Sequence, residues 1–324
     1  MVNLAVVGAG IGGCSAAYFA RKLLSNPEIT VYEKANRIGG RVLTFKGEQI
    51  TSELGGTFFN SSNPTVSPLI AETGLQVKKL EEFMDFAVWN GTEILFQSNH
   101  PMFYKMLKLV TKYKLSVPRL VRILNDSHRK LEKMYKKAEQ PAEFWELFEA
   151  AGLDKWYKHR FDTLLLEAGV NQTFIDELIT PITRIIYSQN AEMAGFAGLV
   201  ALLGVYADAI YSLKDGNAVF PVALLEKSGS TVQLETEVTS IEKTADQTFR
   251  VYGGENSTVF DAVIVASPLE TANIQFDGTE NQNMPKREYQ QIYIRLMKGI
   301  VDKRFFNMDG SAKLPSIILT SKQA

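Results

Sequence analysis

The residues best suited to chemistry are glycines near the N-terminus, which follow an apolar run at fixed spacing. The run Leu4–Val7 leads into Gly8-Ala9-Gly10-Ile11-Gly12-Gly13, which has the spacing GxGxxG and opens an alanine-rich stretch. Gly8 permits a tight strand-to-helix turn, Gly10 lets the backbone approach a pyrophosphate, and Gly13 lets the helix pack closely on the strand. The amide groups that open such a helix attract phosphate. The motif alone is weak evidence, because ordinary turns also use glycine.

A carboxylate follows the glycines at the distance expected for a dinucleotide site. The second apolar run, Ile29–Tyr32, ends at Glu33, which lies 20 residues beyond Gly13. An acid at this position accepts hydrogen bonds from ribose hydroxyls, and its charge repels a 2′-phosphate. NADP is therefore disfavoured.

A third signal completes the ordered set. It is Arg37-Ile38-Gly39-Gly40-Arg41, with Glu53-Leu54-Gly55-Gly56 shortly after it. Arg37 and Arg41 can donate hydrogen bonds to phosphate or to flavin carbonyls, and the alternative is a solvated surface arginine. Together the three signals predict a bound flavin dinucleotide.

Composition narrows the class of protein. A length of 324 residues and 45% hydrophobic content suit two domains, or one elaborate domain, with a real core. A net charge of −1 and a pI near 6.4 argue against a general nucleic-acid binder. The 3 histidines and the single Cys14 form no ligand cluster, so we expect no metal site. Cys14 is interpreted as a small buried apolar residue.

The signals for cellular location conflict. No stretch approaches the roughly 20 apolar residues that a membrane span needs. The first predicted strand begins almost at Met1, so we expect no signal peptide in this chain. Asn-x-Ser/Thr sequons are nevertheless in excess of the roughly two expected by chance, which is typical of the secretory pathway. They lie at Asn60, Asn90, Asn125, Asn171 and Asn256.

The first part of the chain predicts the strands and the helix that position these residues. Residues 1–65 predict a strand–helix–strand unit extended by the Gly55-Gly56 turn. Residues 77–96 predict strands with Asn90-Gly91 as a hairpin turn. Residues 102–206 have a helical pattern. Its expected breaks lie near Pro118, Pro141, Gly152, Gly169 and Pro181.

The pattern returns to β structure after the helices. Strands are expected over 237–242 and 249–252, and a buried strand over 261–267 is stopped by Pro268. This return predicts that the chain re-enters the first domain. More strand is expected over 293–301 and 316–319.

The segment Lys105–Lys137 is the most basic part of the chain. It carries eleven Lys or Arg residues and two acids, Asp126 and Glu132. One interpretation is a helix pair that docks on an anionic membrane or covers a lipid-entry channel. The other is a solvated basic face over a core stripe.

At this point the sequence resembles the flavoprotein amine-oxidase superfamily and, within it, the prenylcysteine oxidases (prenylcysteine lyases). The resemblance spans nearly the whole chain, and the glycine motifs indicate only the superfamily. The segment Arg184–Gln189 favours the family. The matching motifs are Val7–Gly13 with Ser15–Tyr18, Ile38–Arg41, Glu53–Gly56, Thr180–Arg184 with Tyr187–Gln189, Asp215-Gly216-Asn217 and Val263–Leu269.

The resemblance implies an α/β fold with a Rossmann-like FAD-binding domain and an inserted helical and mixed-sheet substrate domain. The FAD domain would comprise residues 1–65 and 213–275, and the substrate domain residues 66–212 and 276–324. Members of the family continue past the equivalent of Ala324, so the substrate domain is expected to be incomplete at the C-terminus. A lysosomal or secretory location is also implied.

The resemblance further implies an FAD enzyme that oxidises the thioether of farnesyl- or geranylgeranyl-cysteine with O2. The products are free cysteine, a prenyl aldehyde and hydrogen peroxide. Alternatives are an amine oxidase or desaturase relative, or a non-catalytic lipid-binding protein. By this comparison the expected FAD contacts are Gly8, Gly10, Gly13, Glu33, Arg41, Gly56 and Val238.

Candidates for the substrate side are Arg184, Tyr187 and Gln189. Arg184 would bind the cysteine carboxylate, or else pair with an acid such as Glu177. Tyr187 would more readily pack in the core than act in catalysis. No general base is assigned.

Overall fold

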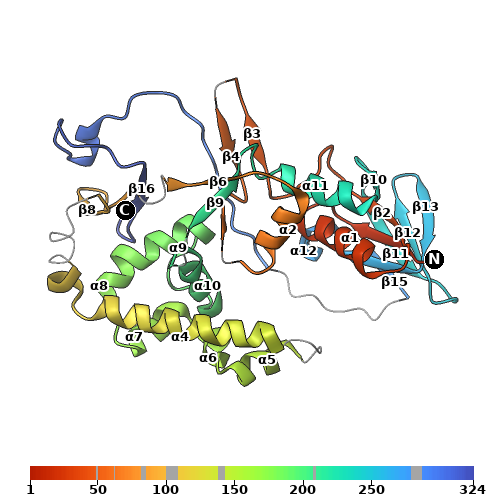
Figure 1. Ribbon diagram of the computed structural model, residues 1–324, viewed down its shortest axis with the longest axis horizontal. Coiled ribbons are helices and arrows are strands. Elements are labelled where there is room, and N and C mark those ends of the chain that lie inside the picture. Colours follow the sequence, from red (N-terminus) through yellow and green to blue (C-terminus); the bar gives the residue numbers. More distant parts are fainter. Residues whose placement is uncertain are drawn as a thin grey trace. The chain divides into compact units, whose positions relative to one another are not determined.

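The structure is a computed structural model that describes residues 1–48, 50–61, 63–81, 85–99, 109–137, 143–206, 209–278 and 287–324. The chain divides into two compact units (Figure 1). The first consists of Met1–Phe59, Asn63–Lys79 and Tyr211–Gln291, and the second of Asn60–Ser62, Leu80–Ile210 and Ile292–Ala324. Residues 66–79, expected in the substrate domain, belong to the first unit by their contacts. The assignment of one unit to FAD and the other to substrate stays a prediction.

A parallel sheet forms the centre of the first unit. Its order is β10 (Thr231–Gln233), β2 (Glu28–Tyr32), β1 (Asn3–Val7) and β14 (Ala262–Val265). Helix α1 (Ile11–Leu23) connects β1 to β2 and packs against α11 (Val219–Ser228). Such strands are apolar because elements cover both faces of the sheet. The pairing of β14 with β1 confirms that the chain re-enters the first unit after the helices.

A second sheet lies beside the parallel one in this unit. Its order is β13 (Asn256–Phe260), β12 (Phe249–Gly253), β11 (Val238–Lys243) and β15 (Gln275–Asp277), with β15 parallel to β11. Buried Val7 and Tyr32 from the parallel sheet join Val251 and Phe260 in one apolar cluster. This cluster fixes how the two sheets meet.

Smaller elements complete the first unit. Strands β3 (Thr44–Lys46) and β4 (Thr51–Glu53) form an antiparallel pair. The edge strand β6 (Val77–Lys79) pairs with β9, whose range Ile210–Leu213 begins at the boundary between the units. Helix α2 (Val66–Thr73) packs against α11, and α12 (Leu269–Ala272) follows β14. The short strand β5 (Phe59–Asn60) also lies at the boundary.

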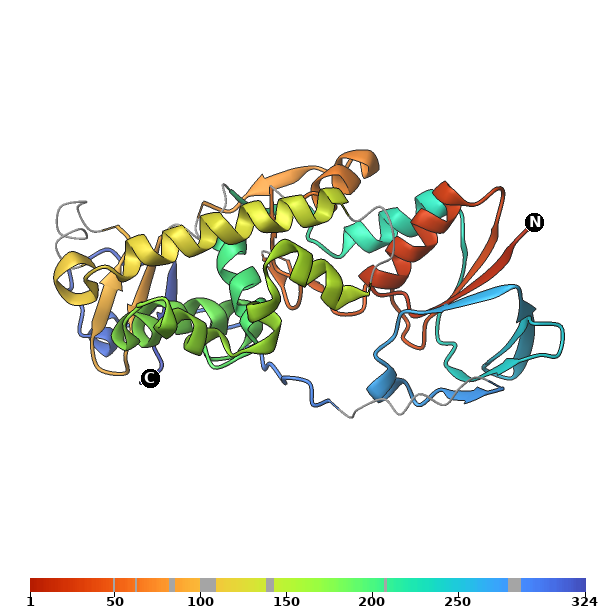
Figure 2. The same cartoon turned by 90° about the horizontal axis from the view of Figure 1, so that it is seen from below.

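The second unit combines helices with a small sheet (Figure 2). Phe161, Leu165, Ile175 and Leu199 are among the buried residues of its core. Strand β7 (Phe86–Trp89) pairs antiparallel with β8 (Ile94–Gln97) and parallel with β16 (Ile317–Thr320). The helices are α4 (Ser116–Lys137), α5 (Phe144–Ala151), α6 (Asp154–Lys158), α7 (Phe161–Glu167), α8 (Gln172–Phe174), the π-helix η2 (Ile175–Ile179), α9 (Thr180–Tyr187) and α10 (Gly195–Tyr206).

Local turn chemistry explains the hairpin between β7 and β8, which confirms the predicted turn at Asn90-Gly91. Asn90 Oδ1 accepts hydrogen bonds from the amides of Thr92 and Glu93 at 2.9 and 2.8 Å. Gly91 has a φ of 98°, which favours glycine. The helix breaks at Gly152 and Gly169 are also confirmed, since α5 and α7 end there with positive φ at both glycines.

The break expected near Pro181 is wrong. The chain remains helical from Gln172 to Tyr187, and Pro181 lies in the first turn of α9. The five residues of η2 immediately precede that helix. A wider π-turn next to proline accommodates its missing amide donor without ending the helix. Pro141 and the helical pattern over 102–108 lie outside the described residues.

The strand expected over 293–301 is also wrong, whereas β16 confirms the one over 316–319. The structure assigns no strand to 293–301, and its apolar side chains are exposed, with Met297 at 89% and Ile300 at 102%. A strand requires backbone pairing as well as apolar residues, and sequence pattern reports only the latter. A 3₁₀-helix, η3 (Lys303–Phe306), follows. In the described part of the chain no helix has the length and apolar character needed to span a membrane.

Candidate functional site

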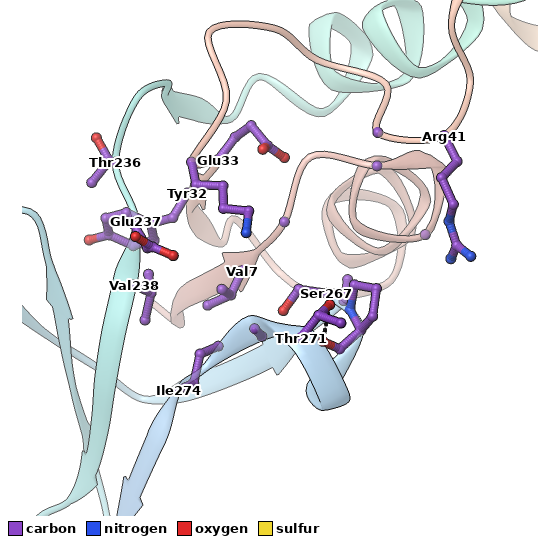
Figure 3. A pocket seen from close by; sticks show the side chains of 18 of the residues that line it. Val7, Tyr32, Glu33, Arg41, Thr236, Glu237, Val238, Ser267, Thr271 and Ile274 are labelled. Carbon is purple, nitrogen blue, oxygen red and sulfur yellow. Dashed lines mark hydrogen bonds between the residues drawn. The ribbon is translucent and has the colours of Figure 1, made fainter. Parts of the chain in front are cut away.

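A cavity of about 530 Å³ opens at the carboxyl ends of β1, β2 and β14 in the first unit. This edge of a parallel sheet is where α/β proteins bind ligands, and the volume is in the range of small-molecule sites. Figure 3 shows Glu33, Val238, Ser267 and Arg41 arranged around it. The lining residues include Val7, Gly8, Gly10, Gly12, Tyr32, Glu33, Lys34, Gly40, Arg41, Thr236, Glu237, Val238, Ser267, Pro268, Thr271 and Ile274.

The glycine loop between β1 and α1 forms one wall of the cavity. Gly8 has a φ of 103°, a conformation that side chains rarely adopt. A Cβ on Gly13 would lie 1.8 Å from the Gly8 carbonyl oxygen, so only glycine lets α1 start this close to the strand. Gly8, Gly10 and Gly12 line the cavity, and the first amides of α1 open beside them. Such amides and the helix dipole favour an anionic group.

The Glu33 carboxylate is held at the cavity by backbone donors. Its Oε2 accepts a hydrogen bond from the Ala9 amide at 2.8 Å, and its Oε1 accepts one from the Ala35 amide at 2.9 Å. Each oxygen retains a further lone pair that a hydroxyl group can use. The carboxylate is therefore both fixed in position and able to accept from a ligand.

The Gly39-Gly40 turn lies directly against the first glycine loop. The Gly39 amide donates to the Ala9 carbonyl at 2.8 Å, and a Cβ on Gly40 would come within 3.0 Å of Gly10 Cα. Arg41 follows and lines the cavity, with its guanidinium 5.7 Å from the centre of the Tyr289 ring. The structure thus brings two of the predicted glycine signals into contact.

Arg37 does not share the position of Arg41. Its Nη2 donates to the Gly40 carbonyl at 2.8 Å, which closes its own turn. Its side chain therefore supports the turn that places Arg41.

The Gly55-Gly56 turn braces this arrangement from outside the cavity. The Gly56 amide donates to the Arg41 carbonyl at 3.0 Å, and a Cβ on Gly55 would lie 2.0 Å from that carbonyl. The Gly56 carbonyl accepts from Asn217 Nδ2 at 2.8 Å. Gly56 is absent from the residues that line the cavity, and its role as a cofactor contact stays a prediction.

Several lining residues were not found by sequence reasoning. Ser267 and Thr271 follow β14, Ile274 precedes β15, and Thr236 and Glu237 precede β11. The sequence places Ser267 in the motif Val263–Leu269, at the end of an apolar run, but that pattern does not indicate a ligand contact. Val238, which was predicted, is buried and lines the cavity.

Ser267 lines the cavity with a hydroxyl group that has no protein partner among the described residues. Its Oγ is buried. A buried hydroxyl without a partner is costly, so a ligand that supplies one is favoured.

The substrate-side candidates belong to the second unit. Arg184 Nε donates to Asn190 Oδ1 at 2.8 Å, and its Nη1 donates to Thr320 Oγ1 at 3.3 Å and to the Ser321 carbonyl. Tyr187 is 37% exposed, so it is not a core residue. Gln189 is half-buried just beyond the end of α9. Their role in binding stays a prediction.

The alternative that pairs Arg184 with Glu177 is wrong. The Glu177 carboxylate is buried and accepts from Tyr113 Oη at 2.8 Å, and Lys112 Nζ lies 2.7 Å from it. Burial first, and the carboxylate second, raise the pKa of Tyr113. The partners of the Glu177 carboxylate are therefore Tyr113 and Lys112, and not Arg184.

Cys14 is buried in α1, as predicted. Burial raises the pKa of its thiol to about 12, so it stays protonated and unreactive at neutral pH. Among the residues that the structure describes, no three His, Cys, Asp or Glu side chains gather as metal ligands.

The parallel sheet, the glycine loop and Glu33 define a dinucleotide-binding α/β protein. An NAD(P)-binding Rossmann-like domain model matches residues 6–73. A putrescine oxidase structure with bound putrescine superposes with a TM-score of 0.64 at 18% identity, covering 87% of this chain and 61% of that one. A putative protoporphyrinogen oxidase from Exiguobacterium gives a TM-score of 0.53 at 17% identity, covering 82% and 59%. The fold is that of amine-oxidase-like flavoproteins.

The comparisons also identify a protein family within this fold class. The prenylcysteine lyase model matches residues 96–324, and the chain belongs to this family. Farnesylcysteine lyase from Arabidopsis thaliana is 27% identical over 98% of this chain and 67% of its own length. Prenylcysteine oxidase 1 from Bos taurus is 30% identical over 94% and 64%, and that from Rattus norvegicus 28% over the same shares. The chain spans about two thirds of the length of these relatives.

Proposed function

We propose that this chain binds FAD in the cavity of the first unit. The amides that open α1 beside Gly10 would hold the pyrophosphate, and Glu33 would accept from the ribose hydroxyls. The backbone at Val238 would contact the adenine, and Arg41 would donate to a phosphate or a flavin carbonyl. The unpartnered hydroxyl of Ser267 is the observation that carries this proposal, since the cavity offers it no protein acceptor or donor.

We further propose that the enzyme oxidises the thioether of S-prenyl-L-cysteine. Family membership and the names of the relatives support this substrate. When bound, the flavin supplies a hydride acceptor that is reoxidised by O2, so that thioether, water and O2 give prenyl aldehyde, free cysteine and hydrogen peroxide. The chain's own residues position the reactants: the glycine loop and Glu33 hold the cofactor, and Arg184 binds the cysteine carboxylate.

An absorbance spectrum of the purified chain, followed by anaerobic addition of farnesylcysteine, tests both proposals. We expect a flavin band that bleaches on addition and peroxide once air is admitted. A flavin band that persists would refute the substrate but leave the cofactor site intact. Failure of the chain to bind added FAD would refute the cofactor site itself.

Ser267→Ala is expected to separate cofactor binding from stability. The unpartnered hydroxyl contributes nothing in the absence of a ligand, so the free energy of unfolding without FAD should not fall. Loss of a hydrogen bond worth about 1 kcal/mol should weaken FAD binding roughly fivefold. Urea denaturation and quenching of flavin fluorescence measure the two quantities. Unchanged FAD affinity would contradict a role for Ser267.

Arg184→Gln is expected to raise KM for farnesylcysteine by about tenfold or more, with a smaller change in kcat. The reason is the loss of a charge-assisted hydrogen bond of about 1.5–3 kcal/mol to the substrate carboxylate. Steady-state kinetics with farnesylcysteamine, which lacks that carboxylate, provide the control. An equal penalty with both substrates would mean that Arg184 serves only to hold Asn190 and Ser321. Arg304→Gln, at an exposed arginine, is the matched variant.

A further inference from the structure

Helix α4 carries exposed cations along one side. Arg119, Arg122, Arg129 and Lys133 are all exposed and follow at intervals of three, seven and four residues. At 3.6 residues per turn, this spacing places the four side chains on the same side of the helix. We refer to these four residues as the basic stripe.

The opposite side of α4 is already covered by protein. Leu124 and Ser127 are 3% and 2% exposed, and α4 packs against α5 and α10. Figure 2 shows α4 as the long yellow helix with the green helices of the second unit along it. The apolar side of α4 therefore serves the core, which confirms the predicted core stripe, and the basic stripe is exposed on the other side.

One acid interrupts the basic stripe, but two cations neutralise it. Asp126 Oδ2 lies 2.9 Å from Lys130 Nζ, and its Oδ1 lies 3.1 Å from Arg129 Nη2. The hydrogen bond from Lys130 is the main cause of the lowered pKa of Asp126, so this acid stays ionised and paired. Glu132, the other acid of the helix, lies 3.9 Å from His128.

The remaining cations of the basic stripe have no acidic partner in the residues that the structure describes. Arg119 donates to the Gly169 carbonyl, which orders its side chain without cancelling its charge. No ion pair involves Arg122 or Lys133 within those residues. Like charges three and four residues apart destabilise a helix by about 0.2–0.5 kcal/mol per pair, and a negatively charged partner would offset this repulsion.

Two further observations indicate the kind of partner. The chain as a whole has a net charge of −1, whereas residues 105–137 carry eleven Lys or Arg and two acids, so this segment has a local excess of positive charge. Val110 and Leu115, which precede the basic stripe, are both 59% exposed. Cations that follow exposed aliphatic side chains in the sequence are typical of segments that bind the boundary between lipid headgroups and acyl chains. A general nucleic-acid binder would carry a basic charge overall.

We propose that the basic stripe docks this protein peripherally on a membrane surface rich in anionic phospholipid. Electrostatic attraction to the headgroups supplies the binding. The docking surface needs neither FAD nor substrate, so it is independent of the proposed function.

Co-sedimentation with vesicles tests the proposal. We expect the chain to bind vesicles of phosphatidylcholine with phosphatidylserine, and to bind phosphatidylcholine alone far more weakly. Arg122→Gln combined with Lys133→Gln should weaken binding by about 25-fold, because each cation near an anionic surface contributes about fivefold. Added salt should release the protein, since it screens exposed charges. Lys46→Gln with Lys227→Gln, which removes equal charge from exposed positions of the first unit, is the matched control.

The vesicle-binding results either support or contradict the proposed docking surface. Loss of binding in the stripe variant with retention in the control supports the proposal. Equal binding to both vesicle compositions, or equal loss in both double variants, overturns it. Arg122→Lys with Lys133→Arg preserves the charge and should retain binding, while a thermal unfolding scan shows that each variant is folded. Failure of this charge-preserving variant to bind, despite being folded, also contradicts an electrostatic surface.

Discussion

Gly13→Ala is expected to destabilise the first unit by about 3 kcal/mol and to abolish flavin binding. The added methyl group would lie 1.8 Å from the Gly8 carbonyl oxygen and 3.3 Å from Val6 Cγ1. Backbone cannot move aside as a flexible side chain can, so α1 must shift away from β1. That shift also removes the helix amides from the cavity. Urea denaturation and a flavin absorbance spectrum measure the two effects.

Gly12→Ala is the matched control for that prediction. No atom lies within 4 Å of a Cβ at Gly12, and the residue has helical geometry in the same turn of α1. Without added flavin, alanine should stabilise the helix by about 0.5 kcal/mol, because glycine loses more backbone entropy on folding. Equal destabilisation by both variants would contradict the close packing of α1 on β1.

Asn217→Ala is expected to cost about 3 kcal/mol of unfolding free energy, measured by urea denaturation. Asn217 is 6% exposed, and its Oδ1 accepts from the Leu213 amide at 2.9 Å. Its Nδ2 donates at 2.8 Å to the carbonyls of both Gly56 and Thr57. Alanine leaves all three backbone groups without this partner. Asn256→Ala, at an exposed position of β13, should change stability by no more than about 0.5 kcal/mol.

The variant Asn217→Asp tests the same buried position through the pH dependence of the unfolding free energy. The introduced carboxyl group would be buried against two carbonyl oxygens, so its folded pKa should rise above the unfolded value of about 3.9. A raised folded pKa means that stability is retained below the unfolded pKa and lost as pH increases through the folded pKa. The destabilisation relative to the native chain should therefore grow as the pH rises from about 4 towards neutral. A pH-independent difference would contradict the buried position of this side chain.

The network around Asn217 shows a limit of reasoning from sequence. In the sequence, Glu53 and Asp215-Gly216-Asn217 belong to separate motifs. The structure joins them: Glu53 Oε1 accepts from the Asn217 amide at 2.8 Å, and its Oε2 accepts from Thr44 Oγ1 at 2.9 Å. Residues 53 and 217 are separated in sequence by most of the second unit, including residues 80–210, and a pattern within a short window contains no information about that pairing.

The arginine side chains show the same limit of reasoning from sequence. Arg37 and Arg41 were equivalent donors by residue type, and Arg184 had two possible partners. In the structure, Arg37 donates to the Gly40 carbonyl. Arg184 donates to Asn190 Oδ1 and to the Ser321 carbonyl. A guanidinium reaches several ångströms in any direction, so its partner depends on where distant backbone lies.

The sequence by itself determined the strand–turn–helix at Gly8–Gly13, the carboxylate at Glu33 and the hairpin at Asn90-Gly91. These depend on backbone freedom and hydrogen bonds within a few residues, which residue type controls directly. Only the tertiary structure decided that β14 pairs with β1 and brings Ser267 to the cavity beside Gly8. It also decided that residues 293–301 form no strand in the described chain. Strand pairing and cavity walls are contacts between segments far apart in sequence, and their free energy comes from packing that exists only in the folded chain.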